Sequence, residues 1–105
     1  MNETTITKIR DIIKNIPIDA KVYRLMNSYL NFGNYEGFLR LNHIVYTEVF
    51  NSYMNIKSNN LEKRKYAQFL EQIVEISYFI HNHLDKYSGG KKWILLYGKA
   101  IKYKS

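Results

Sequence analysis

The feature that most constrains this chain is a long, unbroken helical spacing of large apolar residues in its second half. Eight of them repeat on one helical face through about six turns. Ser88, Gly89 and Gly90 follow at once and predict the end of this helix, while Asn60 is a candidate N-cap for its start. An apolar face of this length needs partner helices, because docking supplies most of a helix's stability. The eight residues are Tyr66, Phe69, Leu70, Ile73, Ile76, Ile80, Leu84 and Tyr87.

Two shorter helices are predicted before residue 34. The first ends at Pro17, because the residue before a proline is pushed out of the α region. The second begins at Asp19, an acceptable N-cap, and ends near Gly33, where a glycine can adopt the left-handed conformation. The first helix carries the stripe Ile6, Ile9, Ile13 and Ile16 and can be capped by Asn2, Thr4 or Thr5. The second is expected to bury Val22, Leu25, Met26 and Tyr29.

A third helix is predicted from Tyr35 or Glu36 to about Ile56. Its apolar surface is unusually wide, which predicts a central helix with neighbours on two sides. One face holds Phe38, Leu41, Ile44, Val45, Val49, Tyr53 and Ile56, and a second face holds Leu39, Tyr46 and Phe50.

The last segment, residues 91–105, fits two patterns. Trp93, Leu96, Tyr97, Ala100 and Ile101 suit a helix, whereas residues 100–104 also alternate like a strand, and we favour a short helix. One proline and five glycines leave room for few turns. The sequence therefore predicts one all-α domain over residues 1–105, an antiparallel bundle of four to five helices with a lysine-rich C-terminal segment, residues 86–105.

Composition excludes several classes of protein. The absence of cysteine excludes disulfides and thiolate metal sites. No apolar run approaches the roughly 20 residues of a membrane-spanning helix, and the polar start does not resemble a signal peptide, so we expect a cytoplasmic protein. Ten tyrosines and many Asn, Lys and Ile residues, all with A/T-rich codons, suggest an A/T-rich genome or a mobile element.

The three histidines do not predict an active site. His81 and His83 diverge by roughly 200° on a helix and cannot bind one metal ion together. His81 precedes Asp85 by four residues, which predicts a surface pair, and His43 has no carboxylate three or four positions away. Nucleophile-elbow, Walker and dinucleotide glycine motifs are absent. We therefore predict a non-enzymatic protein without catalytic residues, metal ion or cofactor.

The charge distribution points to a binding role. The net charge is +7, and residues 86–105 hold six lysines and no acid. A second basic cluster, residues 63–65, opens the long helix, and antiparallel packing of a fifth helix would bring it near residues 99–104. Lysines supply phosphate contacts, and interleaved aromatics can stack on bases or dock into the bundle. The predicted nucleic-acid-binding residues are Lys63, Arg64, Lys65, Lys91, Lys92, Trp93, Lys99, Lys102 and Lys104.

A protein partner with an acidic surface is the alternative to nucleic acid, and an anionic membrane surface is a third possibility. In size, charge and helix count the chain resembles the small helical proteins that protect bacteria from their own class II bacteriocins, which implies an immunity or inhibitor module. The spacing Tyr66-x2-Phe69-Leu70-x2-Ile73-x-Glu75-Ile76 resembles the last helix of four-helix proteins associated with ribosomal RNA insertions and retroelements.

Overall fold

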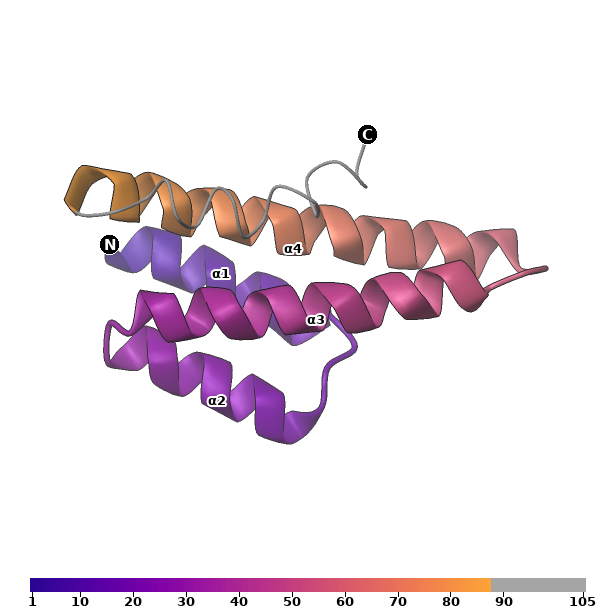
Figure 1. Cartoon of the computed structure of the whole chain (residues 1–105), viewed down its shortest axis with the longest axis horizontal. Coiled ribbons are helices and arrows are strands. Elements are labelled where there is room, and N and C mark those ends of the chain that lie inside the picture. The colour runs from indigo at the N-terminus through magenta and orange to yellow at the C-terminus, as the bar shows by residue number, and fades with distance from the viewer. Residues whose placement is uncertain (88–105) are drawn as a thin grey trace.

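Residues 1–87 fold as a bundle of four helices: α1 (Glu3–Asn15), α2 (Ala20–Asn31), α3 (Tyr35–Asn55) and α4 (Asn60–Tyr87) (Figure 1). The computed structural model describes the backbone of residues 1–87 and the side chains of residues 1–83. Successive helices run antiparallel, and contacts join α1 to α2, α2 to α3, α3 to α4 and α4 to α1, which closes a ring of neighbours. This confirms the predicted all-α antiparallel bundle. The predicted fifth helix, in residues 91–105, lies outside the described residues.

Polar side chains fix where each helix begins. Asn2, Asp19 and Asn34 cap α1, α2 and α3, and each side-chain oxygen accepts a backbone N–H at 2.7–3.0 Å. The expected cap of α4 was wrong by one residue. The side-chain oxygen of Asn59, not that of Asn60, accepts the backbone N–H of Glu62 in the first turn of α4, at 3.1 Å. The side chain of Asn60 is therefore not engaged as the helix cap.

Gly33 ends α2 in the predicted left-handed conformation, with φ of +68°. The N–H of Asn34 donates to the carbonyl of Tyr29 at 2.8 Å, and the N–H of Gly33 donates to Leu30 at 3.3 Å. This pair of hydrogen bonds is the Schellman motif, which satisfies the last carbonyls of the helix. It also reverses the chain so that α3 can run back along α2.

We expect Gly33→Ala to destabilise the fold by about 1 kcal/mol, because a Cβ is disfavoured at this φ. Apart from Gly33 itself and its two chain neighbours, no described atom lies within 4 Å of the position that the Cβ would occupy, so the lost stability comes from the backbone conformation and not from a clash. Gly33→Asn should cost less, since asparagine tolerates the left-handed region. Urea denaturation followed by circular dichroism measures both, and an alanine variant as stable as the parent would contradict the assigned conformation.

The core draws buried side chains from all four helices. It contains Ile9, Ile13, Ile16, Met26, Leu30, Phe38, Leu39, Val45, Tyr46, Val49, Leu70, Ile73, Val74, Ile76 and Ile80. Two expected core residues are in fact on the surface, since Leu25 is 44% and Ile44 is 52% exposed. At 100° per residue, Ile44 lies opposite the centre of the buried arc of α3, which consists of Phe38, Leu39, Asn42, Val45, Tyr46 and Val49. Leu25 lies beside the α2 stripe of Met26 and Leu30, which faces the core instead.

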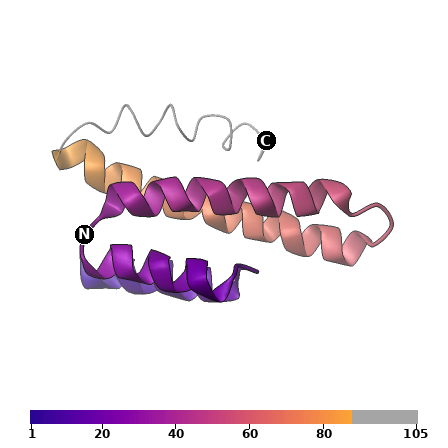
Figure 2. The same cartoon turned by 60° about the horizontal axis from the view of Figure 1, so that its bottom comes forward.

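The α3–α4 hairpin is longer than the rest of the bundle. Figures 1 and 2 show its connector end extending beyond both α1 and α2. We call residues 53–67 the hairpin tip. Within residues 1–87, this tip projects past the ends of α1 and α2, whereas α4 also packs on α1 along its other part. The fold thus presents the predicted basic cluster, residues 63–65, on a projecting part of the molecule.

Candidate nucleic-acid interface

The basic cluster of α4 lies on the hairpin tip, close to the start of the helix. Arg64 and Lys65 are exposed and Lys63 is half-buried. With Lys57 as a fourth cation and Glu62 as the one acid, residues 53–67 have a net charge of +3. Cations at this end of a helix oppose its dipole, so their placement costs stability unless other groups stabilise them.

Aromatic rings of the hairpin stabilise two of these cations. The Lys63 ammonium lies 5.0 Å from the centre of the Tyr53 ring, and the Lys65 ammonium lies 6.0 Å from the centre of the Phe69 ring. Both distances are those of cation–π contacts, which are worth about 0.5–1 kcal/mol each at exposed sites. The Lys63 contact joins α3 to α4 and fixes the relative position of a cation and an aromatic face.

A concavity of about 300 Å³ opens beside this contact. It is lined by Tyr53 from the end of α3 and by Asn60, Lys63, Arg64 and Ala67 from the start of α4. The wall thus combines one aromatic ring, one amide, two cations and a methyl group. Such a set can hold a planar group together with an attached anion.

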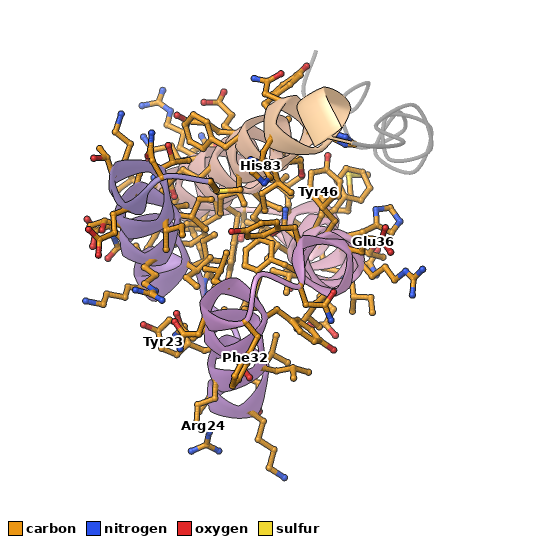
Figure 3. The ribbon with its side chains drawn as sticks, turned by 90° about the vertical axis from the view of Figure 1, so that its left-hand side faces the viewer. Tyr23, Arg24, Phe32, Glu36, Tyr46 and His83 are labelled. Atoms are coloured by element: carbon orange, nitrogen blue, oxygen red, sulfur yellow. The ribbon has the colours of Figure 1, made fainter. Side chains whose placement is uncertain are left out.

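The Tyr53 ring continues a row of aromatic rings along α3. Tyr46 and Phe50 are stacked with ring centres 6.2 Å apart, and Phe50 and Tyr53 follow at 6.4 Å. Spacings of four and three residues place the three rings on one face of the helix. Tyr46 is buried in the core, whereas Phe50 and Tyr53 are half-buried, so the row leads from the core to the hairpin tip. Figure 3 shows Tyr46 between the ribbons of α3 and α4.

The structure brings together three of the predicted binding residues, Lys63, Arg64 and Lys65. The other six lie outside the described residues: Lys91, Lys92, Trp93, Lys99, Lys102 and Lys104. The expected proximity of residues 63–65 to residues 99–104 is untested for the same reason. Sequence reasoning missed Tyr53, expected in the core, and Asn60, expected as a cap. A signal for Tyr53 was present, because residues 53 and 63 lie equally far from residue 58 in the connector and so face each other in a short antiparallel hairpin.

The histidines near the C-terminal end of α4 have separate surroundings. His81 is buried, only 4% exposed, so its predicted position on the surface is wrong, and the Asp85 side chain of the predicted pair lies outside the described side chains. His83, labelled in Figure 3, is half-buried. Its ring is edge-on to Tyr35 with ring centres 5.0 Å apart, and its Nε2 lies 3.5 Å from the amino group of Met1. Among the residues whose side chains are described, no three His, Asp or Glu side chains cluster closely enough to hold a metal ion.

A second concavity, of about 280 Å³, lies between α2 and α3. Exposed apolar side chains surround this face: Leu25 and Ile44 are about half exposed, and Phe32 is 84% exposed. The concavity also carries both signs of charge, from Glu36 and Arg40, and is therefore a less suitable site for a polyanion than the hairpin tip. It is lined by Tyr29, Asn34, Glu36, Gly37, Arg40, Leu41 and Ile44.

Comparison with protein-family models, with curated proteins and with solved structures found no match. Within residues 1–87, no helix is long and apolar enough to cross a membrane. The part of the chain that the structure describes is a four-helix bundle whose α3–α4 hairpin projects a basic, aromatic tip.

Proposed function

We propose that this chain is a non-enzymatic, cytoplasmic protein that binds nucleic acid through the hairpin tip. The observation that carries the proposal is the shared concavity of Tyr53, Lys63 and Arg64 at an end of the molecule that α1 and α2 leave uncovered. Cations and an aromatic ring side by side are the two groups with which proteins hold a phosphate backbone and its bases. The six lysines of residues 86–105 add phosphate contacts in this proposal.

The chemistry of the cations favours contacts to phosphate over base recognition. Lysine acts as a point charge and binds phosphates without reading sequence. Arg64 is the one guanidinium of the tip, and its planar fork suits a bidentate contact with phosphate oxygens. Binding should therefore be weakly sequence-specific and should fall steeply as the salt concentration rises.

The test compares two triple variants that each remove three positive charges. Lys63→Gln, Arg64→Gln and Lys65→Gln alter the tip, whereas Lys8→Gln, Lys14→Gln and Lys21→Gln alter exposed lysines of α1 and α2. Each lost phosphate contact should reduce the slope of log affinity against log salt by about 0.9 on duplex DNA, so the tip variant should lose up to about 2.7. We expect the control to change the slope little, and circular dichroism to show both variants folded.

If the two triple variants have equal slopes of log affinity against log salt, the hairpin tip is not part of the nucleic-acid interface. The variant Lys91→Gln, Lys92→Gln, Lys99→Gln and Lys102→Gln then tests residues 86–105 in the same way. If the parent binds neither DNA nor RNA at low salt, the proposal is wrong.

A protein partner is the second candidate function, and the α2–α3 face supports it. Leu25, Phe32 and Ile44 expose apolar surface there beside a concavity. If the chain is an immunity or inhibitor module that binds a protein through this face, its affinity should depend little on the salt concentration. Salt dependence thus separates the two candidates.

A further inference from the structure

The concavity at the hairpin tip contains more than phosphate binding requires. Lys63 and Arg64 alone would attract a backbone, yet the Tyr53 ring and the Asn60 side chain line the same space. Because Asn59 caps α4, the Asn60 amide takes no part in the cap, and Asn60, which lines the concavity, can offer both a donor and an acceptor there. An aromatic face and an amide are the groups that recognise, respectively, the face and the edge of a base.

The Tyr53 ring contacts two neighbouring side chains and also lines the concavity. Phe50 stacks on it within α3, with ring centres 6.4 Å apart, and the Lys63 ammonium lies over it at 5.0 Å. The ammonium sits on a long, flexible stem, so it can leave the ring for an arriving phosphate. This exchange is favourable because a cation–π contact at an exposed site is weaker than a charge-assisted contact with phosphate.

A recessed ring distinguishes single strands from duplexes. In a duplex both faces of each base are covered by its neighbours, and a ring inside a concavity cannot reach into a groove to displace them. An unpaired base offers a free face and can enter the concavity. The volume of about 300 Å³ is at the lower end of ligand sites in proteins and suits one nucleotide.

We infer that the concavity of the hairpin tip holds the base of an unpaired nucleotide, stacked on Tyr53, and that the chain prefers single-stranded nucleic acid to duplex. This inference rests on the proposed function and restricts the nucleic acid that is bound to single strands. Lys63 and Arg64 hold the flanking phosphates, Asn60 meets the edge of the base, and the small side chain of Ala67 leaves room for it.

The decisive probe is a pair of strands with identical charge. One is a thymidine strand about 16 nucleotides long, the upper end of the sites that single-strand-binding folds cover, and the other is an abasic strand of equal length. The parent should bind the thymidine strand about tenfold more tightly, the ratio for one stacked base. Tyr53→Leu should abolish this ratio, whereas Tyr53→Phe, which keeps the ring, should retain it.

Tyr78→Leu is the matched control, because Tyr78 is an exposed tyrosine of α4 about 22 Å along the helix from Lys63. It should keep the tenfold ratio. If Tyr53→Leu is poorly folded, Ala67→Leu fills the concavity and leaves Tyr53 intact, and it should abolish the ratio as well.

Two results would overturn the inference in different ways. Equal binding of both strands by the parent, with binding still weakened by the triple tip variant, leaves the proposed function standing and removes the base site. If the parent binds neither strand at low salt, both the base site and the proposed function are wrong. A duplex of the same length bound as tightly as the thymidine strand would also contradict the preference for single strands.

Discussion

Ile73→Ala should lower the free energy of unfolding by about 2–5 kcal/mol, through lost transfer energy and the cavity left behind. Ile73 lies in the middle of α4 and is completely buried. Within residues 1–87, α4 packs on α1 and α3, which contribute fully buried side chains such as Ile9 and Phe38. We therefore expect the cavity left by the alanine to stay closed to water. A loss of this size is a large part of the roughly 5–15 kcal/mol that stabilises a domain.

Glu71→Ala is the control for this prediction. Glu71 lies two residues earlier on α4 and is exposed, so its replacement should change the stability by no more than about 0.5 kcal/mol. Urea denaturation of both variants gives the two midpoints. Coincident midpoints would mean that the face of α4 assigned to the core is wrong.

The helices could be predicted from the sequence because their signals are local. The isoleucine stripe ending at Pro17, the cap at Asp19 and the left-handed Gly33 each depend on a few neighbouring residues, and all three are observed. The cap of α4 was missed because Asn59 and Asn60 are chemically equivalent as caps. Only the backbone geometry of the connector decides between them.

The faces of the helices were harder to predict than their positions. Apolar spacing made Leu25 and Ile44 candidates for the core, yet both are about half exposed. Conversely, the polar residues Ser77 and His81 of α4 are buried. Which face is covered depends on how α2, α3 and α4 pack together, and spacing along one helix does not contain that information.

The residues of the candidate site also differ in how well the sequence predicts them. Its charges, Lys63, Arg64 and Lys65, could be predicted because a run of cations is visible in the sequence. Its aromatic wall was missed although the spacing of residues 53 and 63 about the connector pointed to it. Tyr53 lies on α3 and becomes part of the site only when residues 56–59 fold back and bring it under Lys63. The function proposed here therefore depends on an element of tertiary structure.

Burial of polar groups between α3 and α4 leads to the second large prediction. Asn42 is completely buried on α3, and its Nδ2 donates to the Ile73 carbonyl at 3.1 Å and to the Ser77 Oγ at 3.0 Å. The Ser77 hydroxyl in turn donates to the same carbonyl at 3.3 Å. The Asn42 amide thus joins the two longest helices at the centre of the bundle.

Asn42→Asp should destabilise the fold by about 3–5 kcal/mol at neutral pH, the cost of an uncompensated buried charge. The new carboxylate has no hydrogen to donate, so it faces the Ile73 carbonyl oxygen with its own negative oxygen. Asn42→Leu should cost less, about 1 kcal/mol, because the Ile73 carbonyl keeps its bond within the helix and no charge is buried.

The pH dependence separates this charge effect from a packing defect. Burial raises the pKa of the introduced carboxyl above the value of about 3.9 that it has in the unfolded chain. The loss of stability relative to the parent should therefore be small below about pH 3.9, grow as the pH rises above it, and reach its full size above the raised pKa of the folded state. Urea denaturation of the parent, Asn42→Asp and Asn42→Leu across this range makes the comparison, and the leucine variant should differ from the parent by a constant amount. A penalty for Asn42→Asp that is equal at every pH would show that the carboxylate reaches water, and that the interface between α3 and α4 is more open than the structure describes.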